Sequence, residues 1–429
     1  MLRSKIGAVA GRLGWGVGDQ ALSSLTNFAL GILVARSFGS TAFGAYSLAF
    51  ATYLVTLNVS RGLATDPFVV RYSGTKGSVW QDGLAAGLGM TLIVGLVSGV
   101  ACLLAGLAFE GVMRAAFFAL GLTMPGLILQ DTYRFSFFAL ARGGLAVLND
   151  LLWAVVQFLG LALLIGAHQL SVFALVLVWG GAATVASVAG GLQAGVAPQP
   201  ARIGGWLREH RELALRYLGE NLTVGGVNAL WSYGVGAIAG VSALGSLQAA
   251  RLLIAPLNVL YQGVSFVAVP EAIRVLRLSA RRLLNTGMLI AGGLGGATLA
   301  WGVAMLLLPT SLGVRLLGPS WTPAHQLLVP MTLLTVNLAL TVGALVGLRA
   351  LGAASRSLRA RLVGSALILG GVFVGAAVGG APGAAWGNVI GSSIAVVGWW
   401  RQLAIGVREY QAPSLEPAAD APRPVGYGQ

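Results

Sequence analysis

One ionisable side chain lies deep inside an apolar stretch of the sequence. Arg251 occurs in SLQAARLLIAPLNVLYQG, about two helical turns inside a membrane-length segment. A charge at that depth is costly unless it faces a cavity or a partner. We therefore interpret Arg251 either as a cation facing a central cavity or as a buried arginine capped by carbonyl groups or a neighbouring glutamate. Pro256 is expected to kink the helix and free carbonyl groups, and Asn258 continues the polar character.

A second set of polar residues recurs at matching positions in the two halves of the chain. Asp19 and Glu220 are expected in the first turns of two spans, where an acid complements the helix dipole. Amide side chains follow in both copies: Gln20, Asn27, Asn221 and Asn228. These amides either line one cavity from two sides or form hydrogen bonds between helices.

Further charges and prolines lie near one end of the predicted spans. Asp131 and Arg134 are three residues apart and can pair on one helix face, although Arg134 can also reach lipid headgroups. Arg61 is either an ordinary membrane anchor or a first phosphate contact for a ligand entering from the cytoplasm. Pro67 and Pro270 are expected to break two corresponding helices, and such breaks in two repeats indicate a transport pathway.

The composition places these residues in a lipid environment. The chain is 56 % hydrophobic and only 9 % charged, so its apolar surface cannot be hidden from water in a soluble domain. Its apolar runs are continuous and about 20 residues long, which favours membrane-spanning helices. The three histidines are scattered, and no nucleotide-binding motif occurs. The sequence therefore predicts neither an enzyme nor a metal site, and the single cysteine allows no disulfide framework.

We predict an all-α integral membrane protein with about twelve transmembrane helices in two six-helix lobes. The expected domains are an N-terminal lobe (1–195), a cytoplasmic linker with an interfacial helix (196–216), a C-terminal lobe (217–408) and a disordered cytoplasmic tail (409–429). The expected spans are 14–36, 43–65, 83–108, 114–140, 145–167, 170–194, 217–239, 244–269, 284–308, 324–348, 361–379 and 383–405.

The basic residues orient these spans. With the N-terminus inside, 23 lysines and arginines fall at inner loops, termini or helix ends, whereas Arg36, Arg114 and Arg315 fall outside. That asymmetry follows the positive-inside rule and predicts a bacterial inner-membrane protein with both termini in the cytoplasm. It also accounts for the net charge of +14, which in a soluble protein would suggest a nucleic-acid partner.

The first predicted hairpin recurs at an offset of 201 residues. Gly18-Asp19-Gln20 matches Gly219-Glu220-Asn221, and Asn27 matches Asn228. Gly44 matches Gly245 in the same register, and Phe50 of the first copy stands opposite Arg251 of the second. The pattern indicates an internal duplication, which predicts two lobes around an asymmetric ligand cavity.

These features resemble a known family. The hairpin LVARSFGSTAFGAYSLAF is similar to the opening of the Wzx-like oligosaccharide flippases of the MATE/polysaccharide-transporter (MOP) superfamily. The blocks PGLILQDTYRFSFFALARGGLAVLNDLLWAVVQ and GLRALGAASRSLRARL have the same character. The resemblance implies alternating-access transport of polyprenyl-pyrophosphate-linked oligosaccharides from the inner to the outer leaflet. It makes Arg251 the expected phosphate ligand, with Arg61 and Arg134 as additional cations. No cofactor is implied, although a Na⁺ or H⁺ gradient is a possible energy source.

Several alternatives stay open on the sequence alone. The chain could be a lipid II-type flippase, or a drug/cation antiporter of the same superfamily, which would need deep carboxylates. A non-transporting scaffold of a polysaccharide assembly complex is a different class, and it would not need a deep arginine. The partners expected for the leading interpretation are the lipid-linked oligosaccharide, the bilayer, and a polysaccharide polymerase or glycosyltransferases.

Overall fold

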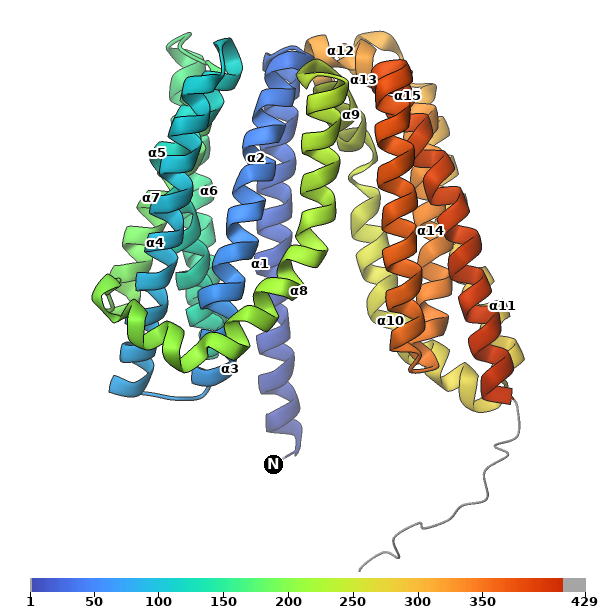
Figure 1. The fold of residues 1–429 in the computed structure, drawn as a ribbon, viewed down its shortest axis with the longest axis horizontal. Helices are drawn as coiled ribbons and strands as arrows, with labels where there is room; N and C mark the ends of the chain where they lie inside the picture. Colours follow the sequence, from blue (N-terminus) through green and yellow to red (C-terminus); the bar gives the residue numbers. More distant parts are fainter. Residues whose placement is uncertain (1, 412–429) are drawn as a thin grey trace, which may run out of the picture. The chain divides into compact units, whose positions relative to one another are not determined.

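The computed structural model describes residues 2–411, and within that range every regular element is helical (Figure 1). This confirms the predicted all-α fold. The elements are α1 (Leu2–Ser37), α2 (Ser40–Ser60), a π-helical turn η1 (Arg61–Thr65), α3 (Asp66–Tyr72), α4 (Ser78–Ala108), α5 (Gly111–Ala139), α6 (Gly143–Gly166), α7 (Val172–Ala194), η2 (Pro200–Arg202), α8 (Ile203–Ile238), α9 (Val241–Ile254), α10 (Leu257–Leu278), α11 (Ala280–Leu306), α12 (Thr310–Leu317), η3 (Gly318–Ser320), α13 (Trp321–Gln326), α14 (Leu328–Ala350) and α15 (Ala354–Gln411).

Eight helices within residues 2–411 are long and apolar enough to cross a membrane. The last of them, α15, is 58 residues long and contains two helices that meet at Gly379 and Gly380, whose backbone is not helical. Gly380 has φ of +58°, a conformation that glycine adopts without a steric penalty. Residues 409–411 belong to α15, so the predicted tail from 409 starts too early, and its remainder lies outside the described residues.

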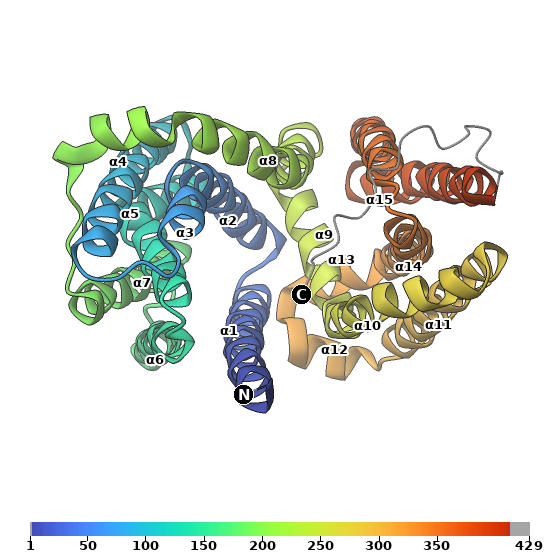
Figure 2. The ribbon, with the colours of Figure 1, turned by 90° about the horizontal axis from the view of Figure 1, so that it is seen from below.

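The predicted interfacial linker is not a separate element. α8 is one helix of 36 residues that joins most of the 196–216 segment to the seventh predicted span. It passes α4 and α3 and then continues beside α2 (Figures 1 and 2). Its Trp206 is buried, because the indole packs on the Cα of Gly87 and donates a hydrogen bond to the Leu63 carbonyl oxygen at 3.0 Å. The interleaved charges of the segment remain exposed on the other faces of the same helix.

The chain forms two compact units. The first comprises the chain up to Ala255 together with Met305–Val329 and Gly371–Gly387. The second comprises Pro256–Ala304, Pro330–Gly370 and the chain from Asn388 on. The first unit thus includes α8 and α9, which follow the predicted boundary between the lobes. The predicted lobe division therefore stays a prediction, while the unit boundary lies between Ala255 and Pro256.

The duplicated hairpins cross each other in the first unit. At Gly44 of α2, an added Cβ would meet the Val241 carbonyl oxygen, and at Gly245 of α9 it would meet the Ser40 carbonyl oxygen. Residues 40 and 241, like 44 and 245, are matched by the offset of 201, so the two contacts are reciprocal. The Ser40 and Ser242 hydroxyl oxygens lie 2.7 Å apart beside this crossing. Reciprocal contacts of this kind are what a duplicated hairpin produces around a local two-fold axis.

The second unit has its own apolar core near one end of α10, α11, α14 and α15. Small side chains such as Ala272 and Ala344 pack there with Leu283, Trp399 and Leu403. Small residues allow close helix approach, which supports helix association where lipid removes the ordinary hydrophobic driving force. Elsewhere in this unit, Asn337 of α14 donates hydrogen bonds to Ser392 and Ser393 of α15 at 2.8 and 2.9 Å.

Candidate functional site

A cluster of five charged side chains lies inside the first unit. Arg61 binds Asp131 through both ends of its guanidinium fork, with Nε and Nη2 at 2.8 and 2.7 Å from the two carboxylate oxygens. Arg134 lies 3.3 Å from an Asp150 oxygen and 3.6 Å from an Asp19 oxygen. α1, η1, α5 and α6 each contribute at least one of these residues. We call this group the buried charge cluster.

The buried charge cluster contains three carboxylates and two guanidinium groups, so it carries one excess negative charge when every member is ionised. Asp19, Asp131 and Asp150 are all buried. The Oδ1 atom of Asp19 and the Nε atom of Arg134 are buried without a hydrogen-bond partner. The cluster thus has spare acceptor and donor capacity as well as unbalanced charge, which is costly in a purely structural ion-pair network.

Amide side chains extend the cluster toward α7. Gln130 donates hydrogen bonds to Asp150 at 2.7 Å and to Asn149 at 3.2 Å. Asn149 in turn donates to the Ala186 carbonyl oxygen of α7 at 2.8 Å. These bonds hold the Asp150 carboxylate in one orientation toward Arg134, so the acid is a fixed part of the site.

Two adjoining pockets lie between α1 and α6. The smaller has a volume of about 20 Å³ and is lined by Leu22, Ser23, Thr26, Asn27, Asp150, Trp153, Ala154 and Gln157. Gln157 is fully buried, and neither its carbonyl oxygen nor its amino group has a partner. A polar pocket of this size holds about one water molecule.

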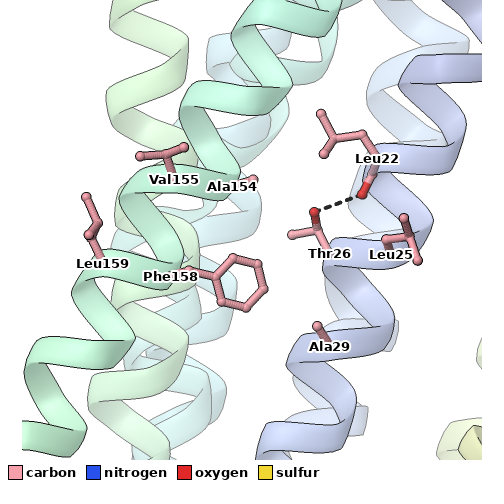
Figure 3. A pocket seen from close by; sticks show the side chains of 8 residues that line it. All are labelled: Leu22, Leu25, Thr26, Ala29, Ala154, Val155, Phe158 and Leu159. Carbon is pink, nitrogen blue, oxygen red and sulfur yellow. Dashed lines mark hydrogen bonds between the residues drawn. The ribbon is translucent and has the colours of Figure 1, made fainter.

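The larger pocket, of about 560 Å³, is almost wholly apolar (Figure 3). Phe158 of α6 points toward α1, and Leu22, Leu25 and Ala29 of α1 and Val155 and Leu159 of α6 complete the lining. Its one polar side chain, Thr26, donates its hydroxyl hydrogen to the Leu22 carbonyl oxygen at 2.8 Å. This pocket therefore presents hydrocarbon and no free polar group from the side chains that line it.

Arg251 lies apart from the buried charge cluster. It is half-buried on α9, its guanidinium carbon is 3.8 Å from the centroid of the Trp231 ring, and Nη1 lies 3.5 Å from Oε1 of Gln248. Within residues 2–411, no carboxylate is within ion-pair distance of Arg251. Stacking on Trp231 and the contact with Gln248 hold the charged group in place without neutralising it.

The structure corrects the expected roles of three acidic residues. Asp19 is not in a first turn: α1 begins at Leu2, and Asp19 is a buried member of the charge cluster. Glu220 lies in the interior of α8 and is exposed, so neither acid caps a helix dipole. Asp131 binds Arg61 rather than Arg134, because η1 brings the Arg61 fork directly opposite the carboxylate.

The expected amides are dispersed. Asn221 donates to an Asp66 oxygen at 2.7 Å, and Gln20 donates to the Ser24 hydroxyl at 3.3 Å, one turn along its own helix. Asn27 contributes to the small polar pocket. Asn228 and Asn258 are exposed.

The three prolines differ in what they do to their helices. Pro67 does not break its span, which runs from Ser40 to Tyr72 with a π-helical turn just before the proline. Pro270 lies inside an uninterrupted α10, so the expected break is absent there too. Pro256 lies at the step between α9 and α10, which end and begin at Ile254 and Leu257. The predicted pair of matching breaks is therefore wrong for Pro67 and Pro270.

Sequence reasoning overlooked Asp150 and Gln157. Both lie within the predicted span 145–167, in the segment NDLLWAVVQ. The rule that identified Arg251, that an ionisable residue inside a span needs a partner or a function, applies equally to Asp150. The partners of Asp150 come from α5 and lie 16 and 20 residues away along the chain, which is why local spacing did not suggest them.

Comparison with known proteins gives the fold its context. The sequence matches no protein-family model and no curated protein. Among solved structures, it is similar to a multidrug resistance MATE family transporter of the MOP superfamily in an inward-facing conformation, with a TM-score of 0.68 and 14 % identity over 91 % of this chain and 96 % of that one. It is also similar to the lipid II flippase MurJ in an inward closed conformation, with a TM-score of 0.68 and 11 % identity over 92 % and 90 % of the two chains.

A third similar structure is a MOP superfamily transporter from Pyrococcus furiosus, with a TM-score of 0.56 and 14 % identity over 94 % and 96 % of the two chains. The matched structures thus include a flippase and drug transporters, and each covers nearly the whole of both chains. Identities this low carry no information about substrate. The structural similarity does establish the architecture: this multi-pass helical chain has the fold of the MATE/MOP transporters.

Proposed function

We propose that this protein is a flippase that moves a polyprenyl-pyrophosphate-linked oligosaccharide from the inner to the outer leaflet of the bacterial inner membrane. The observation that carries this proposal is the state of Arg251, a half-buried cation that stacks on Trp231 with no carboxylate at ion-pair distance among residues 2–411. A guanidinium held in this way can bind two phosphate oxygens through its planar fork.

The fold and the charge distribution support the same proposal. One of the similar structures is the lipid II flippase MurJ, a protein that moves a lipid. Alternating access would carry the pyrophosphate past Arg251 while the polyprenyl chain stays in lipid. The asymmetry of the basic residues supports cytoplasmic termini, on the side where such lipid-linked sugars would be loaded. A polysaccharide polymerase or glycosyltransferases would be functional partners.

Arg61 and Arg134 have a different place in this proposal from the one expected from sequence. Both bind buried carboxylates, so they are not available as phosphate ligands in this conformation. We assign the phosphate contact to Arg251 and give the buried charge cluster a role in shaping the first unit.

The test is translocation by the full-length protein in proteoliposomes. A fluorescent polyprenyl-pyrophosphate oligosaccharide in both leaflets is reduced from outside by dithionite, and the protected fraction reports translocation. Arg251→Ala should reduce the rate at least tenfold, and Arg251→Lys should recover part of it, because lysine keeps the charge and loses the bidentate fork. Arg315→Ala, which removes an exposed arginine of α12, is the matched control and should translocate like the wild type.

In cells, the same Arg251→Ala variant should abolish surface polysaccharide while its level in the membrane stays normal. Wild-type translocation and normal surface polysaccharide in Arg251→Ala would reject the assignment of Arg251 to the ligand.

The buried charge cluster favours a second candidate, a drug/cation antiporter. An antiporter needs carboxylates inside the helix bundle, and Asp19 and Asp131 are both buried. Asp150 adds a third buried acid, so the cluster carries one more acid than base. In the same vesicles, an antiporter would exchange an organic cation for Na⁺ or H⁺ and lose this activity in Asp150→Asn, while Arg251→Ala would have little effect.

A further inference from the structure

The π-helical turn η1 has a carbonyl group that its own helix cannot fully satisfy. At the junction of η1 with α3, where the chain returns to α-helical spacing, the carbonyl oxygen of Leu63 would accept a hydrogen bond from the backbone N–H of residue 67, but Pro67 has none. The donor comes instead from another element: the indole nitrogen of Trp206, on α8, lies 3.0 Å from the Leu63 oxygen. Both Trp206 and Pro67 are buried, so water does not readily replace this bond.

The first turns of α8 are fixed on this turn by further contacts. The Trp206 ring stacks on His210 with centroids 4.1 Å apart, and His210 and Trp206 both lie beside Tyr72 of α3. Farther along α8, the backbone of Leu218 passes so close to Gly62 that a Cβ there would lie 2.5 Å from the Leu218 Cα. η1 is therefore held by α8 at two successive residues, Gly62 and Leu63.

Arg61 begins the same turn, and its position depends on the turn's register. The N–H of Asp66 donates to the carbonyl oxygen of Arg61, five residues back, which is the π-helical spacing. Rearranging a π turn to an α turn removes one residue from the turn and rotates the flanking segments relative to each other by about 100°. That rotation would take the Arg61 fork away from Asp131, to which it now donates two hydrogen bonds.

We propose that Trp206 is a positioning residue for Arg61: its indole N–H supplies the donor that Pro67 withholds from Leu63, and this keeps η1 in the register that pairs Arg61 with Asp131. α8 thereby acts as an external support for the buried charge cluster. The inference concerns a contact within the first unit and does not depend on the transported substrate.

The test follows the reactivity of Asp131 in the purified full-length protein. An apolar carbodiimide modifies protonated carboxyl groups in apolar surroundings, and mass spectrometry locates the adduct. In the wild type, Asp131 is held as a carboxylate by Arg61 and should be protected. Trp206→Phe keeps the aromatic ring and removes the N–H, so labelling at Asp131 should rise several-fold and the unfolding temperature should fall by a few degrees.

Restoring the donor within the helix gives the decisive variant. Pro67→Ala supplies a backbone N–H to Leu63 at the junction with α3, beyond the Asp66–Arg61 hydrogen bond of the π turn. The double variant Pro67→Ala/Trp206→Phe should therefore show wild-type protection of Asp131. Trp400→Phe is the matched control: that indole donates to the Leu340 carbonyl oxygen at 3.1 Å in the second unit, and its loss should leave Asp131 labelling unchanged.

Two results would overturn the proposal. Wild-type protection of Asp131 in Trp206→Phe would mean that Trp206 only packs against α4. Labelling that stays high in the double variant would mean that the Leu63 carbonyl is not the link. If Trp206→Phe alone does not fold, the double variant still decides the matter, because it should fold if the missing donor is the cause.

Discussion

At the scale of single residues, the Arg61–Asp131 pair is matched in charge, whereas Arg251 has no carboxylate partner among residues 2–411. Arg61 and Asp131 neutralise each other through two short hydrogen bonds. Arg251 contacts the face of the Trp231 ring and the amide oxygen of Gln248, which hold its guanidinium without cancelling the charge. That difference, rather than depth alone, is why we assign ligand binding to Arg251.

The Arg61–Asp131 pair leads to a prediction about stability. Asp131 is almost fully buried, with 5 % of its side chain exposed, whereas Arg61 exposes 28 %. Arg61→Ala would leave a buried carboxylate without its partner and should destabilise the protein by about 3–5 kcal/mol. Asp131→Asn leaves Arg61 without its partner, and because Arg61 is more exposed, this variant should lose less stability. Chemical unfolding in detergent would measure the free energy of unfolding of both variants. Equal losses in the two variants would contradict the prediction.

A double variant separates pairing from packing at the same site. Arg61→Ala/Asp131→Asn removes both charges, so it should be more stable than Arg61→Ala alone despite carrying one more substitution. Glu220→Gln is the control: Glu220 is exposed on α8, and its replacement should change the free energy of unfolding by less than about 0.5 kcal/mol.

At the scale of elements, the crossing of α2 and α9 depends on two glycines. Gly44 and Gly245 each lie directly against a carbonyl oxygen of the other helix, so any side chain would push the helices apart. Gly44→Ala and Gly245→Ala should each destabilise the first unit by about 1–3 kcal/mol, although alanine is the better helix former. Gly181→Ala in α7, where an added Cβ meets no atom within 4 Å, should be neutral or stabilising.

Thermal unfolding of these three variants gives the measurement for the glycine prediction. A Gly44→Ala protein as stable as Gly181→Ala would show that the crossing tolerates a wider separation. The Ser40–Ser242 contact beside the crossing offers a second probe, since cysteines at these positions should form a disulfide under mild oxidation if the helices approach as closely in lipid.

The elements also mark how far the sequence could predict the structure. Apolar length alone located most of the spans, because the cost of placing unpaired backbone in lipid leaves helices as the available solution. The predicted spans 14–36, 217–239 and 244–269 are not among the eight apolar helices of residues 2–411, and the last is divided between α9 and α10. The same signal could not separate the linker from the seventh span, since α8 continues from exposed charges into apolar residues without a proline. Nor could it foresee that Pro67 would be accommodated by a π-helical turn supported by Trp206.

The site was less predictable than the spans. Arg251 was identified because one charge in an apolar run is visible without any knowledge of contacts. The buried charge cluster could not be assembled in the same way, because Asp19, Arg61 and Asp150 lie far apart in the sequence and meet only through helix packing. The expected pairing of Asp131 with Arg134 was wrong for this reason, since local spacing favours neighbours on one helix.

At the scale of the whole molecule, the charge distribution predicts orientation in the membrane. Ala197 and Gly352 are exposed in connections expected on the cytoplasmic side, and Gln169 is exposed in a connection expected outside. In intact cells, a membrane-impermeant maleimide should label Gln169→Cys and should label Ala197→Cys and Gly352→Cys only after lysis. The native Cys102 is buried and gives a low background.

A reporter fused within residues 196–202, before α8 begins, should likewise behave as cytoplasmic. Labelling of Ala197→Cys from outside in intact cells would reverse the orientation, and with it the direction of transport that we propose.

The uninterrupted course of α8 has a consequence for communication across the membrane. Its first turns are expected at the cytoplasmic surface. The helix is 36 residues long, and Trp231, on which Arg251 stacks, lies near its other end. No loop between those points can absorb a displacement. A protein or small molecule bound to the exposed face of α8 near Arg208 and Arg211 is therefore expected to shift Trp231, and Arg251 with it, without entering the proposed ligand site.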